Sequence, residues 1–176
     1  MKNEPYEKIS SRQIKASRFE ITEDALLING NDACYSFVNI KPGICVIIEM
    51  PQGFAVLKEY RYPIKSWSYE FAAGVIDDGE SPEEAAVREV AEETGYIVDN
   101  LVSLGEFYPS FGATNEIIYL FFASCTRKES SSLEFTEFIT YETMTAIEVE
   151  QLIASGEFKH GAGLAAWLKY KLINLY

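Results

Sequence analysis

The chain has 176 residues, of which 48% are hydrophobic, and its net charge is −12. This length and composition predict one domain of ordinary size with a packed core and one additional element. The acidic balance argues against proteins that bind nucleic-acid backbones, because such binding needs clustered lysine and arginine, so we expect no nucleic-acid partner.

The N-terminal region carries no targeting pattern. Residues 1–10 are polar and charged, unlike a signal peptide, and the longest apolar run, residues 44–48, is too short to cross a membrane. We therefore expect a cytoplasmic protein with no membrane partner. The cysteines at positions 34, 45 and 125 match no zinc spacing, and we expect them to be buried and reduced.

Residues 1–43 predict a small antiparallel sheet after a loose start over residues 1–12. Residues 13–21, 25–28 and 34–38 are typical of strands, and residues 29–32 of a turn. Such a sheet cannot bury a core by itself. It must pack on the rest of its own chain or on a second chain.

Residues 44–176 predict the main domain. Strands are expected over residues 44–49, 54–61, 67–71, 102–108, 116–124 and 135–141, and helices over 82–94, 145–154 and 163–174. Strands mixed with two or three helices favour an α/β sandwich over a helical bundle.

The most informative stretch is residues 74–96, which read GVIDDGESPEEAAVREVAEETGY. Ser81 is a suitable N-cap, Pro82 suits the first helical position, and Glu84 completes a capping box. Gly95 can end the helix in the left-handed region. These signals predict a helix over residues 82–94.

This helix has two faces. Glu89, Glu92 and Glu93 share one face, with Arg88 able to pair with Glu92 or Glu84. The opposite face, which we expect to pack on the core, holds Ala86, Val87, Val90, Ala91 and Thr94. Crowded carboxylates suit a hard divalent cation such as Mg²⁺. The alternative is a solvated acidic surface, which Gly74 and Gly79 argue against because they let backbone carbonyls approach the acidic face.

At each polar and glycine position this stretch resembles the signature of the Nudix hydrolases, with Tyr96 in place of the usual aliphatic residue. The resemblance implies an α/β/α sandwich with a mixed sheet, which hydrolyses a nucleoside diphosphate linked to another group with Mg²⁺ or Mn²⁺. The implied metal ligands are Glu89, Glu92, Glu93 and the backbone carbonyl of Ala73. The resemblance also implies a catalytic role for Glu92 and for Arg88, which would orient the carboxylates. Glu80 would position the helix.

A general base is implied downstream. Residues 108–116 resemble the loop that follows the signature in ADP-ribose pyrophosphatases, with Phe111 in place of a second proline. That loop makes Glu116 the first choice for the base. Glu134 and Glu137 are the alternatives, because the base changes position within the family.

Residues 59–74 resemble ADP-ribose and sugar-nucleotide pyrophosphatases through Arg61 and Glu70, with Ala72 in place of the usual proline. This resemblance implies that residues of this stretch bind the substrate. Arg61 could hold a phosphate or be an ordinary strand-end charge. The aromatic residues Tyr62, Trp67 and Phe111 could stack on adenine or simply pack on the core. His160 matches no metal spacing and is expected on the surface.

The resemblance favours hydrolysis of ADP-ribose to AMP and ribose 5-phosphate. One alternative is another nucleotide sugar of the GDP-mannose or UDP-glucose type, and a second, of a different class, is a Nudix domain that senses a ligand without catalysis. The N-terminal sheet resembles the dimerising element of these enzymes, so a homodimer is expected.

Overall fold

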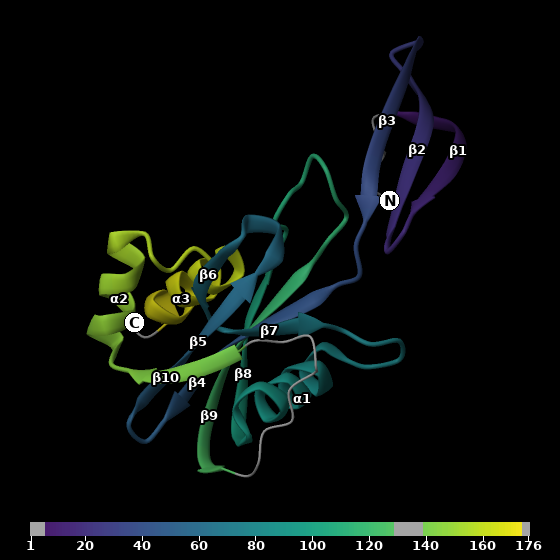
Figure 1. Ribbon diagram of the computed structural model, residues 1–176. Coiled ribbons are helices and arrows are strands. Elements are labelled where there is room, and N and C mark those ends of the chain that lie inside the picture. Colours follow the sequence, from purple (N-terminus) through teal and green to yellow (C-terminus); the bar gives the residue numbers. More distant parts are fainter. Residues whose placement is uncertain (1–5, 129–138, 174–176) are drawn as a thin grey trace. The chain divides into compact units, whose positions relative to one another are not determined.

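The computed structural model describes residues 6–128 and 139–173 (Figure 1). These residues fall into two compact units. The first joins the chain up to Lys41 with the segment Tyr108–Glu116, and the second comprises Pro42–Phe107 and the chain from Ile117 onward. The segment Tyr108–Glu116, which the sequence analysis assigned to the main domain, thus groups with the N-terminal sheet.

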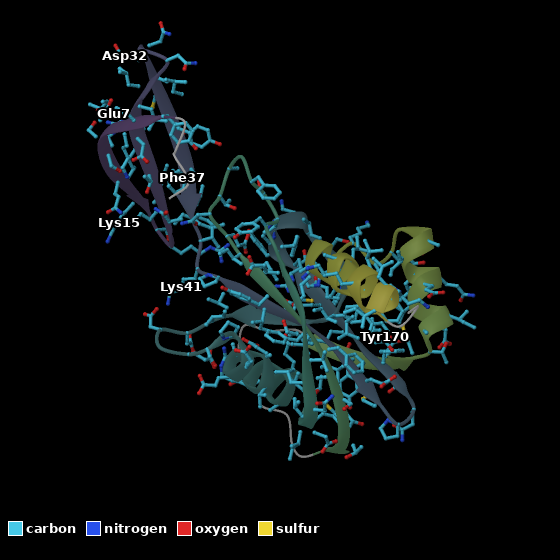
Figure 2. All side chains as sticks on the ribbon, turned by 180° about the vertical axis from the view of Figure 1, so that it is seen from behind. Glu7, Lys15, Asp32, Phe37, Lys41 and Tyr170 are labelled. Carbon is cyan, nitrogen blue, oxygen red and sulfur yellow. The ribbon has the colours of Figure 1, made fainter. Side chains whose placement is uncertain are left out.

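The first unit is an antiparallel sheet of β1 (Glu7–Ala16), β2 (Phe19–Ile28) and β3 (Asn31–Asn39) in that order. Figure 2 labels Lys15 near the end of β1 and Asp32 at the start of β3. Two expectations were wrong here. The start is not loose, since β1 begins at Glu7, and residues 13–21 are not one strand, because Ser17 turns the chain with a φ of 57°. No glycine or proline marks that turn.

The segment Tyr108–Glu116 is tied to β3 by backbone and side-chain hydrogen bonds. Val38 N donates to Ala113 O at 2.9 Å, and Ile40 N donates to Asn115 Oδ1 at 2.9 Å. These bonds explain why a loop from the middle of the sequence belongs to the N-terminal unit.

The second unit is built on a mixed seven-stranded sheet. Its strands are β4 (Gly43–Met50), β5 (Gly53–Arg61), β6 (Ser66–Glu70), β7 (Ala72–Val75), β8 (Tyr96–Phe107), β9 (Ile118–Lys128) and β10 (Ile139–Met144). The main order is β10-β5-β4-β9-β8, with β6 paired to β5 and β7 to β4. Only β4 and β9 run parallel among the described pairs. β8 begins earlier than the predicted residue 102, because register shifts near its start break the alternation that marks a strand.

Helices cover both faces of this sheet (Figure 1). α1 (Pro82–Thr94) lies on one face, while α2 (Ala146–Ser155) and α3 (Gly161–Ile173) lie on the other. A short 3₁₀ helix, η1 (Tyr62–Ile64), links β5 to β6. The predicted α/β/α sandwich with a mixed sheet and a separate small sheet is confirmed.

β4 divides its side chains between the two layers. Ile44, Val46 and Ile48 join the core cluster under α1, whereas Cys45 and Ile47 join the cluster under α3. A strand that is buried on both faces reads as a continuous apolar run, which is why residues 44–48 show no alternation.

Three further expectations need correction or comment. Val87 and Ala91 of α1 are exposed rather than packed on the core. Cys34 is exposed, although Cys45 and Cys125 are buried free thiols as expected. In the described part of the chain, no helix is both long enough and apolar enough to span a membrane.

Candidate active site

α1 is held at both ends by the predicted local signals. The Ser81 Oγ accepts a hydrogen bond from Glu84 N at 3.2 Å, and Ser81 N donates to Glu84 Oε2 at 2.8 Å. At the other end Gly95 has a φ of 74°, and its N–H donates to Ala91 O at 2.9 Å. These caps fix the register in which the helix presents its acidic residues.

The Arg88 side chain is hydrogen-bonded to the carboxylates around it. Its Nε donates to Glu80 Oε1 at 2.9 Å, and its side chain also reaches Glu89 Oε1 at 2.7 Å and Glu92 Oε2 at 3.0 Å. The hydrogen bonds that Arg88 donates to Glu80 are the largest cause of the raised pKa of Arg88, and the same bonds lower the pKa of Glu80. Arg88 also donates to Val75 O at 3.0 Å. It therefore ties α1 to the loop before it and to β7.

Glu89 lies directly over Gly74 of β7. A Cβ at position 74 would collide with the Glu89 carboxylate, so only glycine leaves room for this approach. Glu89 is 8% exposed and Glu93 is 6% exposed, whereas the Glu92 side chain is 41% exposed. Two of the three carboxylates are thus buried rather than displayed on a solvated face.

These residues suit a hard divalent cation by chemistry. Glu89, Glu92, Glu93 and the Ala73 carbonyl supply the oxygen donors that Mg²⁺ and Mn²⁺ prefer, and the missing Cβ of Gly74 lets the Glu89 carboxylate lie against β7. Across residues 6–128 and 139–173, no three acidic, histidine or cysteine side chains already converge as a finished ion site. Glu89 and Glu92 are instead hydrogen-bonded to Arg88. The donor types therefore suit a divalent cation, but the carboxylates are arranged around the Arg88 guanidinium.

Arg61 and Glu70 form a bidentate ion pair between neighbouring strands β5 and β6. Arg61 Nε lies 3.0 Å from Glu70 Oε1, and Arg61 Nη2 lies 2.6 Å from Glu70 Oε2 and 2.9 Å from Glu59 Oε2. Glu70 is 4% exposed. Burial, the largest single influence, lowers the pKa of Arg61, but the Glu70 hydrogen bonds together with the charges of Glu70, Glu59 and Glu93 raise it overall.

Glu93 links this pair to α1. The negative charge of Glu93 contributes to the raised pKa of Arg61. Together with Glu70 it also contributes to the raised pKa of the Cys45 thiol, whose chief cause is complete burial. Arg61, Glu70 and Glu93 therefore lie within electrostatic reach of one another. The second unit thus places the Arg61 guanidinium near Glu93, at the end of the acidic face of α1.

The aromatic candidates are exposed. Tyr62 is 77% exposed, and Trp67 is 53% exposed and meets Tyr60 edge-on at 5.7 Å between ring centroids. Phe111 is 82% exposed and stacks on Tyr108 at 5.4 Å. None of the three candidates is a core residue, and their proposed contact with adenine stays a prediction.

Glu116 belongs to the first unit. Its backbone N–H lies 3.4 Å from Thr114 Oγ1, and burial raises the pKa of its carboxyl group. A raised pKa strengthens a carboxylate as a base. The alternative bases Glu134 and Glu137 lie outside the described residues.

His160 was missed by the sequence analysis. It is not a freely exposed residue: its Nδ1 is buried, and burial lowers its pKa, while Glu70 raises it and Arg61 lowers it further. A bridge between Tyr69 and Phe158 brings this segment beside β6. Nothing local in the sequence indicates that pairing, so no signal could have placed His160 near Arg61 and Glu70.

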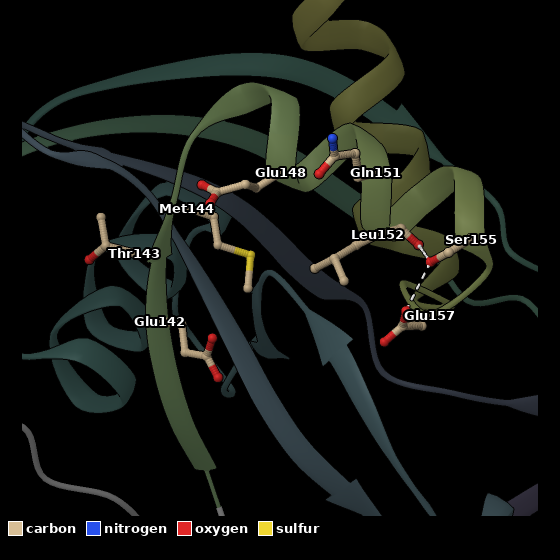
Figure 3. Close-up of a pocket in the computed structure, with 8 residues that line it drawn as sticks. All are labelled: Glu142, Thr143, Met144, Glu148, Gln151, Leu152, Ser155 and Glu157. Atoms are coloured by element: carbon tan, nitrogen blue, oxygen red, sulfur yellow. Dashed lines mark hydrogen bonds between the residues drawn. The ribbon is translucent and has the colours of Figure 1, made fainter.

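A second acidic region lies between β10 and α2 (Figure 3). It is a hollow of about 410 Å³ whose lining includes Glu142, Glu148 and Glu157. Two of these carboxylates have local structural roles, because Glu148 caps α2 through Thr145 and Glu157 accepts a hydrogen bond from Ser155. None of the predicted site residues lines this hollow.

Known proteins resemble this chain in sequence and in fold. The family model for the NUDIX domain matches residues 39–167. An ADP-ribose pyrophosphatase from Bacillus subtilis (strain 168) is 31% identical over 138 residues, which cover 77% of this chain and 75% of that protein. A methanol dehydrogenase activator from Bacillus methanolicus is 32% identical, with 74% and 72% covered.

A further relative carries another name, and a solved structure shares the fold. A GDP-mannose pyrophosphatase from Yersinia pestis (strain Pestoides F) is 29% identical, with 84% of this chain and 73% of that protein covered. A crystal structure of an ADP compounds hydrolase matches with a TM-score of 0.86 at 20% identity, covering 96% of this chain and 93% of that one. At that identity the structural match speaks for the fold alone.

Proposed function

The chain belongs to the NUDIX family and is a Nudix hydrolase, and we propose that it hydrolyses ADP-ribose to AMP and ribose 5-phosphate with Mg²⁺ or Mn²⁺. The likeness to the Bacillus subtilis ADP-ribose pyrophosphatase supports this substrate. The methanol dehydrogenase activator and the GDP-mannose pyrophosphatase, at similar identity, show that the substrate does not follow from family membership.

One observation carries the proposal. Glu93, at the end of the acidic face of α1, is close enough to Arg61 for its charge to help raise the pKa of that guanidinium. A diphosphate needs positive charge along both phosphates. A divalent cation held by the carboxylates, together with the Arg61 guanidinium, would supply positive charge to both phosphates. The chain has an overall charge of −12 and would otherwise repel the substrate.

The residue roles follow from these contacts. Glu89, Glu92, Glu93 and the Ala73 carbonyl would hold the metal, which neutralises phosphate charge and lowers the pKa of the attacking water. Arg88 orients Glu89 and Glu92 through its hydrogen bonds.

The substrate is held by other groups. Arg61, fixed by Glu70, holds a phosphate oxygen, and Tyr62, Trp67 and Phe111 provide rings for the adenine. Arg61 contacts the carboxylates of Glu59 and Glu70. A bound phosphate would compete with these carboxylates for the guanidinium.

Glu116 is the proposed general base, which takes the proton from the attacking water. Replacing it with glutamine should lower turnover by about 10²- to 10⁴-fold, the range for loss of a general base. Because burial raises the pKa of Glu116, activity should fall as the pH drops through a value above that of an ordinary glutamate. The Glu116→Gln variant should lack that acidic limb. An unchanged rate and profile would pass the role to Glu134 or Glu137.

A second candidate function is hydrolysis of another nucleotide sugar, supported by the GDP-mannose pyrophosphatase relative. The same carboxylates and Arg61 would serve, because the diphosphate is common to both substrates. A sensor without catalysis is the third possibility, against which stands the complete set of carboxylates on α1.

A substrate screen separates these functions. The purified chain would be given ADP-ribose, GDP-mannose, UDP-glucose, NADH, diadenosine polyphosphates and nucleoside triphosphates at matched concentration with Mg²⁺. Preference for ADP-ribose with AMP as a product supports the proposal. Preference for another nucleotide sugar keeps the metal chemistry and replaces the substrate. Tight binding of one ligand without turnover favours the sensor.

We also propose that the chain acts as a cytoplasmic homodimer through its N-terminal sheet. β1 and β2 expose several large apolar side chains, including Ile9 at 57%, Ile14 at 42% and Phe19 at 42%, which is more than a single sheet in water usually leaves uncovered. Sedimentation at micromolar concentration should give twice the chain mass of 19.9 kDa. A monomer throughout would refute the dimer.

A further inference from the structure

The N-terminal sheet contains a hollow that the proposed hydrolysis does not use. It has a volume of about 390 Å³, within the range of small-molecule sites. Its lining combines one carboxylate with aromatic and aliphatic side chains, and consists of Tyr6, Asp24, Leu26, Ile28, Tyr35 and Phe37. All six residues belong to the first unit.

The strand register explains why these side chains meet. Asp24 of β2 lies opposite Tyr35 of β3, and Thr22 lies opposite Phe37 (labelled in Figure 2). Alternate residues of a strand share one face, so the carboxylate and both rings project from the same side of the sheet. On the other neighbouring strand Asp24 faces Ser11, whose small side chain leaves room beside the carboxylate.

The Asp24 carboxylate is poorly compensated for its surroundings. Its side chain is 14% exposed, and its Oδ1 is buried without a hydrogen-bond partner among the described residues. Its ion pair with Lys8 is long, with Lys8 Nζ 3.8 Å from Oδ2, and the Lys8 side chain is 57% exposed. A carboxylate among apolar groups with so few partners is costly unless a positive group balances it.

Three aromatic rings line the hollow beside the Asp24 carboxylate. Within the described residues, neither Tyr6, Tyr35 nor Phe37 stacks on another ring or lies under a lysine or arginine. Tyr6 and Tyr35 are each 48% exposed. The Tyr35 hydroxyl donates to Gly112 O at 3.2 Å, which holds that ring in place. The faces of aromatic rings attract cations through their quadrupole.

We propose that this hollow binds the ammonium group of a small organic cation. The carboxylate would repel an anion, and a neutral apolar ligand would leave the charge of Asp24 uncompensated. Mg²⁺ and Ca²⁺ are held by several oxygen donors, whereas the hollow offers a single carboxylate among rings and aliphatic side chains, so its lining does not suit a hard metal ion. An alkylammonium matches both the charge and the rings. The inference does not rest on the proposed hydrolysis.

Choline chloride is the probe, and 3,3-dimethylbutan-1-ol, its neutral isostere, is the matched ligand control. Carbon–proton NMR spectra of the aromatic rings should show shifts of Tyr35 and Phe37 on adding choline. The neutral alcohol should bind at least tenfold more weakly. Equal binding of the two ligands, or choline shifts confined to rings outside the hollow, would overturn the proposal.

Two variants complete the test. Asp24→Asn keeps the shape of the side chain and removes its charge, and it should weaken choline binding at least tenfold. Asp32→Asn, in an exposed position of the same sheet, should leave binding unchanged. Thermal unfolding of each variant checks that it folds. If Asp24→Asn does not fold, Phe37→Leu takes its place, because it preserves apolar bulk and removes a ring. Undiminished binding by the folded variant refutes the cation site.

Discussion

α1 and α2 begin and end alike, yet only α1 carries the features of a site. Both helices start with a capping box, Ser81 with Glu84 and Thr145 with Glu148, and both end at a glycine in the left-handed region. Both lie beside several glutamates. The difference is in what the helices bury.

α2 buries only Val149 among its own residues, and its glutamates stay at the surface. α1 buries Glu89 and Glu93, places Glu89 over Gly74, and holds its carboxylates around Arg88. A count of acidic residues therefore does not distinguish a site from a solvated surface. The distinguishing features are the burial of carboxylates and the backbone space left for them, because burying a charge is costly without a functional or compensating reason.

The sharpest test removes one buried carboxylate from α1 and one surface carboxylate from α2. Glu93→Gln should lower the rate of AMP release by about 10²- to 10³-fold, the range for losing one electrostatic stabiliser of a transition state. Glu150→Gln, which only breaks a half-exposed ion pair with Lys171, should keep the parental rate. Both should unfold at temperatures near that of the parent. A fully active Glu93→Gln would remove α1 from the metal site.

The next test fills the space over which Glu89 lies. Gly74→Ala puts a Cβ where the Glu89 carboxylate now is, so we expect a loss of about 1–3 kcal/mol in the free energy of unfolding, as for overpacking, and at least tenfold lower activity. Gly161→Ala at the start of α3 meets open space and should be neutral or slightly stabilising. Urea unfolding and initial rates measure both. Equal behaviour of the two variants would mean that Glu89 moves aside without cost.

The capping boxes should then behave alike in stability and differently in function. Ser81→Ala and Thr145→Ala should each lower the free energy of unfolding by about 1 kcal/mol, the usual value for an N-cap. Only Ser81→Ala should reduce activity, since α1 alone presents the carboxylates. A loss of activity in Thr145→Ala at full folding would show that α2 also contributes to the site.

The smallest effect concerns pH. Hydrogen bonds from the Ser81 and Thr145 backbones are the main cause of the lowered pKa values of Glu84 and Glu148. The stabilisation is present in full above the ordinary glutamate pKa of about 4.3 and is lost as the pH falls through the lower folded value. Thermal unfolding of Glu84→Gln and Glu148→Gln should therefore approach that of the parent as the pH falls. A difference independent of pH would contradict the assignment.

Local sequence was sufficient for the elements whose ends carry capping chemistry. α1 was predicted over residues 82–94 and has those bounds, and α2 (Ala146–Ser155) differs from the predicted range 145–154 by one residue at each end. Caps work within one turn of chain, so the sequence contains all the groups that form them. The turn at Ser17 has no such signal, so the ends of β1 and β2 were predicted as one strand.

The family, the acidic residues of α1 and the donor types that a divalent cation prefers are all readable from the amino-acid sequence. Burial of these residues depends on the fold, because the sheet under α1 covers Glu89 and Glu93 and leaves Val87 and Ala91 outside. The fold also placed Arg61 against Glu70 across β5 and β6, and His160 within reach of both. These contacts join residues distant in sequence, and their partners are set by strand register and packing, which no local pattern encodes.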